Sequence, residues 1–105
     1  MRTNVKTLAA LVGIAVIATA LPAQAATPTV SSKVKTQLLY LIEEEKLARD
    51  VYAALDAVSI SQKFSNIAKS EQTHMDAVAG LLKTYGIKNP TTGKKPGVFT
   101  DKYLS

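Results

Sequence analysis

The sequence predicts an all-α fold built on an antiparallel helical hairpin. Residues 33–57 contain no Gly or Pro and are rich in Leu, Ala, Glu and Lys, which favours one long helix. Residues 62–85 repeat apolar side chains at three- and four-residue steps, as expected of a second helix. A short Ser-containing break between them makes the two helices antiparallel neighbours.

Residues 1–25 are expected to form a cleavable secretory signal peptide. Arg2 and Lys6 precede an uncharged apolar run, Leu8 to Leu21, and the small residues Ala23 and Ala25 follow. This order is typical of a signal peptide cut after Ala25. The alternative is an anchoring transmembrane helix, but the run is shorter than the roughly 20 apolar residues that a span needs. We therefore expect an exported protein, periplasmic or extracellular, that leaves the membrane after cleavage.

The predicted mature chain has 80 residues and a formal charge of +3, from 11 Lys and Arg against 8 Asp and Glu. No basic stripe interleaves with aromatic residues, so nucleic acid is not an expected partner. The absence of Cys excludes disulfides, thiolate metal sites and lipid attachment through cysteine. Residues 26–32 are expected to be a flexible lead before one small domain.

The first helix is expected to bury one face and expose the other. Ser31 or Ser32 can cap its start. Lys35, Glu43, Lys46 and Asp50 are predicted to face solvent. The stripe predicted to be buried has helical spacing and one ionisable member: Val34, Leu38, Leu41, Glu45, Ala48, Tyr52 and Leu55.

The second helix is expected to start at a capping box formed by Ser59 and Gln62 and to end at Gly86 in a left-handed cap. Residues 86–105 then form a polar loop punctuated by Pro and Gly, where Thr100 can cap the start of a third helix. Two ionisable residues interrupt the stripe predicted for the second helix: Ile67, Glu71, His74, Val78, Leu81 and Tyr85.

Glu45, Glu71 and His74 are ionisable residues on faces predicted to be buried, where they need partners. Glu71 and His74 are i, i+3 neighbours, the Glu-x-x-His spacing of di-metal carboxylate proteins. An antiparallel hairpin that turns near residues 59–60 brings Glu45 level with residue 73 or 74. Carboxylate and imidazole together suit iron, manganese or zinc.

Simpler interpretations of the same residues exist. Glu45 can pair with Arg49 four residues later, and His74 can bond to Glu71 at the edge of a core. Tyr52 is first interpreted as a packing residue and only then as a group behind the metal ligands. On this interpretation the chain is a metal-free helical hairpin that binds a partner, or a fragment that does not function.

Two segments resemble the ferritin-like family called domain of unknown function 2202. They are Leu41-Ile-Glu-Glu-Glu-Lys-Leu-Ala-Arg-Asp-Val-Tyr52 and Asn66-Ile-Ala-Lys-Ser-Glu-Gln-Thr-His-Met-Asp-Ala-Val78. Tyr85-Gly86-Ile87 and Pro96-Gly-Val-Phe-Thr100 are similar to later landmarks of that family, so the resemblance covers about residues 36–104. Glu45-x-x-x-Arg49-x-x-Tyr52 also resembles the first-helix metal motif of rubrerythrins. The resemblance implies Glu45, Glu71 and His74 as ligands of a di-iron site, with Arg49 and Tyr52 behind them.

The family has a four-helix domain, whereas this chain ends where the third helix would begin. The resemblance therefore implies half of a ferritin-like four-helix bundle, a truncated domain over residues 33–105. It implies a metal-binding bundle and no particular reaction. A lone hairpin leaves apolar stripes open, so we expect a homodimer that completes the four-helix bundle. Two copies would together supply four carboxylates and two imidazoles.

Overall fold

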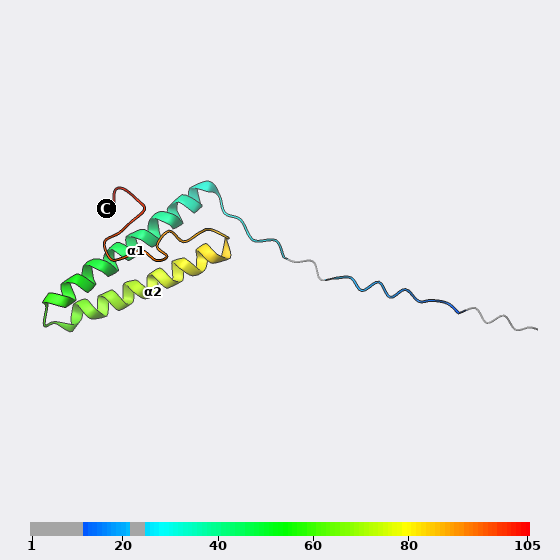
Figure 1. The fold of residues 1–105 in the computed structure, drawn as a ribbon, viewed down its shortest axis with the longest axis horizontal. Coiled ribbons are helices and arrows are strands. Elements are labelled where there is room, and N and C mark those ends of the chain that lie inside the picture. Colours follow the sequence, from blue (N-terminus) through cyan, green and yellow to red (C-terminus); the bar gives the residue numbers. More distant parts are fainter. Residues whose placement is uncertain (1–11, 22–24) are drawn as a thin grey trace, which may run out of the picture.

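The computed structural model describes residues 12–21 and 25–105, and within these it contains two helices and no strand. Helix α1 spans Ser32–Val58 and helix α2 spans Gln62–Thr84. They run antiparallel and side by side (Figure 1). The predicted all-α helical hairpin is confirmed, and both helices lie within one residue of the ranges expected at 33–57 and 62–85.

Each helix begins at a serine cap. The Ser31 side chain accepts a hydrogen bond from the Val34 N–H at 3.2 Å, as expected for α1. For α2 the capping residue is Ser61, whose hydroxyl accepts from the Lys63 N–H at 3.3 Å. The predicted capping box at Ser59 is therefore wrong, because the Ser59 hydroxyl accepts from the Ser61 N–H and shapes the turn before the helix.

Helix α2 ends in a Schellman motif. The Ile87 N–H donates to the Leu82 carbonyl at 2.8 Å, and the Gly86 N–H donates to the Lys83 carbonyl at 3.2 Å. Gly86 has a φ of 64°, the left-handed conformation that this motif requires, so its predicted role is confirmed. The motif turns the chain back onto the hairpin, and Ile87 packs against the core cluster that contains Leu82.

Residues 86–105, which we call the returning segment, fold back along the hairpin (Figure 1). Of the four α1 residues predicted to face solvent, Glu43, Lys46 and Asp50 are buried or nearly so, and Lys35 is exposed as predicted. Glu43 is 2% exposed and Lys46 is 1% exposed. The Glu43 carboxylate accepts from the Thr100 and Asp101 N–H groups at 2.8 and 2.7 Å. The expectation that Glu43 and Lys46 face water is wrong because this segment supplies backbone partners for their charges.

The core lies between the helices and this segment. Its buried apolar residues are Ile42, Met75, Val78 and Leu82. Val34, Leu41 and Leu55 of the stripe predicted to be buried are 39, 37 and 38% exposed. The stripe is therefore only partly buried, since Leu38 packs against the core cluster while these three residues keep more than a third of their surface exposed.

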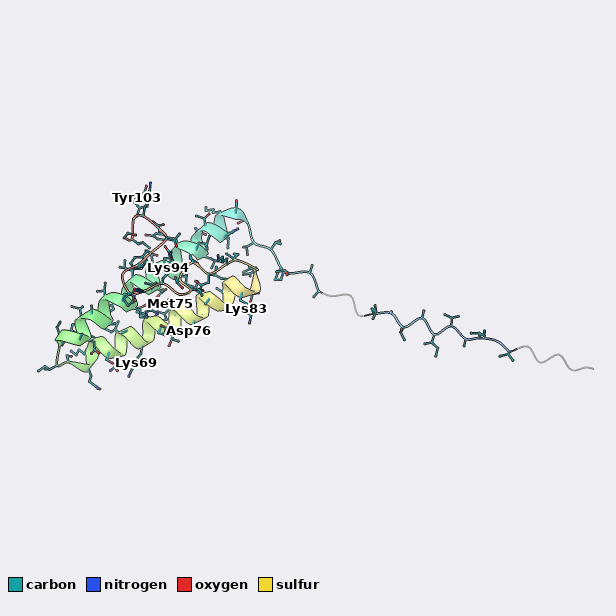
Figure 2. All side chains as sticks on the ribbon, viewed as in Figure 1. Lys69, Met75, Asp76, Lys83, Lys94 and Tyr103 are labelled. Carbon is teal, nitrogen blue, oxygen red and sulfur yellow. The ribbon has the colours of Figure 1, made fainter. Side chains whose placement is uncertain are left out.

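Residues 86–105 contain turns and no helix. No third helix begins at Thr100 in this segment, and the Thr100 N–H donates to Glu43. The Asp101 side chain instead accepts from the Tyr103 N–H at 2.8 Å and closes a short turn. Tyr103 lies at the outer end of this loop and is 82% exposed (Figure 2).

Residues 12–21 and 25–31 form neither helix nor strand and run away from the hairpin (Figure 1). The charged start of the predicted signal peptide lies in residues 1–11, and Ala23 of its cleavage motif lies in residues 22–24, all outside the described residues. Among the helices of the described part, none is long and apolar enough to cross a membrane.

Candidate metal centre

Glu45 from α1 and Glu71 and His74 from α2 meet on one side of the hairpin. Each offers one ligand atom, and these atoms lie within 4.8 Å of one another. The His74 Nδ1 atom is 3.3 Å from Glu45 Oε2 and 3.1 Å from Glu71 Oε2. The predicted register, with Glu45 level with residue 74, is thus confirmed.

Local helix geometry explains this convergence. Glu71 and His74 lie one turn apart on the same face of α2, so their side chains are adjacent without any help from α1. Glu45 reaches them because the turn at residues 59–61 reverses the chain and places the two helices in antiparallel register. All three groups are accessible to a ligand, with side-chain exposures of 20% for Glu45, 18% for Glu71 and 57% for His74.

The pKa values of the two carboxylates in the cluster are shifted in opposite directions. A hydrogen bond with Glu71 raises the pKa of Glu45, and burial raises it further. The same hydrogen bond lowers the pKa of Glu71. The pKa of His74 is raised, first by its hydrogen bond to Glu71 and then by Glu45. Because a cation binds the deprotonated forms of these groups, the raised pKa values of Glu45 and His74 make metal binding compete with protons.

These residues fit a divalent metal ion. Ligand atoms bound to one ion at about 2.0–2.2 Å lie about 3 Å apart. The two distances from His74 Nδ1, 3.3 and 3.1 Å, are already close to that separation. Two carboxylates and an imidazole form a donor set that suits iron, manganese or zinc, and three protein ligands leave positions for other donors.

Arg49 and Tyr52 have partners other than the metal ligands. Arg49 donates to Asp50 from Nε and Nη2 at 3.1 and 2.8 Å, and from Nη1 to Gln72 Oε1 at 2.7 Å. Its hydrogen bonds and its ion pair go to Asp50 and Gln72 and not to Glu45, so the simple Glu45–Arg49 pair is not formed. Tyr52 stacks on Phe64 with ring centroids 6.2 Å apart, which agrees with its first interpretation as a packing residue.

Sequence reasoning missed a second polar cluster on the opposite side of α1. Lys46 Nζ donates to Asp50 Oδ2 at 2.6 Å and to the Lys95 carbonyl at 2.7 Å, and it lies 4.6 Å from the centre of the Phe99 ring. The Gly97 N–H donates to the same Asp50 oxygen at 3.0 Å. The i, i+4 spacing of Lys46 and Asp50 was a visible signal, but it is equally typical of an exposed helix face.

An open apolar surface surrounds the three candidate ligands. We define the open face as the residues of this side that remain exposed around the cluster, with Leu41 at 37%, Leu55 at 38% and Leu81 at 45% exposure. On the predicted helical stripes these leucines lie on the same faces as Glu45 and His74. The cluster therefore has partly exposed leucines on the same helix faces, although Val78 of the same stripe is buried.

The fold and the site together define a helical hairpin that carries a carboxylate–histidine cluster. The chain belongs to the family described as "Uncharacterized protein domain (DUF2202)", whose model matches residues 34–105. It is 50% identical over 72 residues to "Uncharacterized protein MJ0754" of Methanocaldococcus jannaschii. That match covers 69% of this chain and 39% of the archaeal protein, so the chain spans well under half the length of this relative. No solved structure matches the chain.

Proposed function

We propose that this protein is an exported, ferritin-like metal-binding protein that holds iron at Glu45, Glu71 and His74. The observation that carries the proposal is the convergence of two carboxylates and one imidazole from two helices, with their ligand atoms within 4.8 Å. Manganese and zinc suit the same donors and are the competing ions. When bound, iron would supply redox chemistry, and the three residues would hold and orient it.

The ferritin-like assignment rests on the pattern of these ligands. A Glu from one helix and Glu-x-x-His from its neighbour make up half of the ligand set of a ferritin-like di-metal site. In α1 and α2 that half is present on facing helices at matching height. We therefore propose that α1 and α2 are one half of a four-helix bundle, with residues 33–105 as the half-domain.

We further propose that a second copy of the chain covers the open face. The returning segment covers the opposite side of α1, so Leu41 and Leu81 keep 37 and 45% of their surface exposed. Two copies related by a two-fold axis would form four helices and bring together four carboxylates and two imidazoles. A homodimer then has the donors for two metal ions, which a single hairpin lacks.

Metal analysis of the purified protein tests the proposed function. After anaerobic incubation with Fe²⁺ and removal of unbound ions, we expect about one iron per chain, with parallel samples reporting Mn²⁺ and Zn²⁺. The matched control is Glu44→Gln, which removes an exposed carboxylate next to Glu45 and should bind like the wild type. Failure of all three ions to bind would favour a metal-free interaction module or a fragment without function.

Export is a separate part of the proposal with its own test. Expression in a bacterial host followed by fractionation and mass spectrometry should give a periplasmic or extracellular product that begins at Ala26. A mature pool that retains Met1 would contradict export and leave the metal site unaffected.

A further inference from the structure

Arg49 and Gln72 join α1 to α2 one helical turn from the candidate ligands. The Arg49 Nη1 donates to Gln72 Oε1 at 2.7 Å. Among the described residues, the other side-chain hydrogen bond between the two helices joins His74 to Glu45. Arg49 follows Glu45 by four residues and Gln72 follows Glu71 by one, so this bridge lies next to the ligands on both helices.

Hydrogen bonds to Asp50 orient the guanidinium of Arg49 toward Gln72. Two of its nitrogens donate to Asp50 Oδ1, at 3.1 and 2.8 Å. Asp50 is itself 8% exposed in its side chain and accepts from Lys46 Nζ and from the Gly97 N–H through its other oxygen. Because the guanidinium is planar, fixing two donors on Asp50 fixes the direction of the third.

Gln72 is fixed from the far side as well. Its Nε2 donates to Asp76 Oδ1 at 2.8 Å, one turn further along α2. The side-chain amide therefore bridges Arg49 and Asp76, with its oxygen accepting from one and its nitrogen donating to the other. In Figure 2, Asp76 is labelled next to the buried Met75, where α2 packs against the core.

These contacts form one continuous chain from the returning segment to α2. It starts at the Lys95 carbonyl and the Gly97 N–H, passes through Lys46 and Asp50, and continues through Arg49 to Gln72. Every buried side-chain nitrogen and oxygen of the described residues has a hydrogen-bond partner, so removal of one member leaves another unsatisfied. We call this chain of contacts the register relay.

We infer that the register relay is a positioning device for the metal centre, with Arg49 and Gln72 setting the axial register of α1 and α2 at Glu45, Glu71 and His74. This inference rests on the proposed function. The hydrogen bond between Arg49 and Gln72 is directional and 2.7 Å long, so an axial shift of one helix along the other would break it. By the same relay, residues 95–97 act on a metal site that they do not touch.

The test compares Gln72→Met, Arg49→Met and the double variant, with Co²⁺ as the probe. Met is close to Gln in length and is shorter than Arg, and each substitution removes the bridge. Each single substitution should weaken Co²⁺ binding by about 10-fold or more, the usual range for residues that orient ligands. The double variant should bind about as weakly as each single variant, because the two residues act through one contact.

Glu43→Gln is the matched control. It weakens the hold on Thr100 and Asp101 but makes no contact with Asp50, Arg49 or Gln72. We expect a lower melting temperature with an unchanged Co²⁺ affinity and an unchanged cobalt absorption spectrum. If Glu43→Gln weakens Co²⁺ binding as much as Gln72→Met does, the relay has no special role and the inference is overturned.

A second readout works without metal and separates this inference from the proposed function. In the metal-free protein at fixed pH, nuclear Overhauser contacts between the His74 ring and the Glu45 methylenes report the register directly. They should persist in Glu43→Gln and weaken in Gln72→Met. If the wild type binds no Co²⁺, the proposed function fails, but the Overhauser contacts still test the register relay. If they persist unchanged in Gln72→Met, the inference is overturned. Should Arg49→Met not fold, Gln72→Met alone carries both readouts.

Discussion

Glu43, Glu44 and Glu45 are consecutive carboxylates whose environments differ completely. Glu43 is 2% exposed and bound by two backbone N–H groups, Glu44 is exposed, and Glu45 faces His74 across the hairpin. The 100° rotation per helical residue explains the difference, because it directs the three side chains to the returning segment, to solvent and to α2. This run therefore offers internal controls for both stability and metal binding.

Substitution of Glu45 tests the candidate ligand directly. Glu45→Gln keeps the shape of the side chain and removes the charge, so Fe²⁺ or Zn²⁺ affinity should fall by at least about 100-fold, more than for a residue that only orients ligands. Isothermal titration calorimetry measures the change. Glu44→Gln is the control, and equal losses in the two variants would remove Glu45 from the site.

The raised pKa of His74 predicts a defined pH dependence of stability in the metal-free protein. A folded-state pKa above the ordinary 6.5 means that the protonated imidazole stabilises the native state. That contribution is present below pH 6.5 and disappears as the pH rises through the folded-state pKa. His74→Gln should therefore reduce the free energy of unfolding more at pH 6 than at pH 9 in urea titrations.

The control for this pH effect is Lys69→Gln, a substitution of an exposed cation on α2 (Figure 2). Lys69 makes no contact with Glu45 or Glu71, so its effect should be the same at both pH values. A nuclear magnetic resonance titration of the His74 ring provides the direct measurement. A pKa at or below 6.5 would contradict the contacts with the two carboxylates.

At the scale of elements, α1 has two polar faces that serve different neighbours. Glu43, Lys46 and Asp50 bind the returning segment, whereas Glu45 binds α2. The pKa of Asp50 shows that the charges on the α1 face toward the returning segment have strong hydrogen-bond partners. Burial alone would raise its pKa, but hydrogen bonds from Lys46, the Gly97 N–H and Arg49 outweigh burial and lower it. The returning segment is thus held to α1 by charged side chains as well as by the apolar contact of Ile87 with the core.

Removal of Glu43 should loosen that segment. Glu43→Ala leaves the Asp101 N–H, partly buried, without its acceptor, which costs about 1–3 kcal/mol of unfolding free energy. Denaturant unfolding measures the loss, and hydrogen exchange should show faster exchange at Thr100 and Asp101. The exposed neighbour provides the control, since Glu44→Ala should change stability little; equal effects would mean that the contacts contribute nothing.

The end of α2 depends on one backbone conformation. Gly86 adopts a φ of 64° in the Schellman motif, where an L side chain is strained. Gly86→Ala should therefore destabilise the protein by roughly 1–2 kcal/mol. The added methyl would meet only the Thr27 side chain at an ordinary 3.4 Å, so the effect reports backbone strain. Gly80→Ala, in the interior of α2 with open space around it, should be neutral or stabilising in the same thermal unfolding assay.

Periodicity sufficed to predict the hairpin and the Glu45–Glu71–His74 cluster, because both follow from local helix geometry and one turn. It could not identify the true buried face of α1. Lys46 and Asp50 have the spacing of a solvated face, and only the return of residues 95–101 makes them interior. Long-range backbone contacts leave no periodic signal in the sequence, so the register relay was also invisible there.

For the whole molecule, the open face is the surface on which we propose that a second copy packs. One side of the hairpin is covered by the returning segment, and the other carries exposed leucines around polar ligands. Exposed apolar side chains can mark an interface when they gather in one patch. If a second copy covers it, the returning segments lie on the outside of the dimer and the two metal clusters lie at its centre.

The dimer is tested by sedimentation and by charge substitutions on the open face. Analytical ultracentrifugation should give a discrete dimer that Fe²⁺ or Zn²⁺ tightens, with two ions per dimer, because each ion would draw ligands from both copies. Leu41→Glu and Leu81→Glu place a carboxylate in the interface and should give monomers with weakened metal binding. Ile60→Glu is the control, since Ile60 is fully exposed in the turn, at 106%, and should leave the dimer intact. A well-folded monomer whose sedimentation does not change when metal is added would rule out the dimer. If only Ile60→Glu abolished the dimer, the interface would lie at the turn and not on the open face.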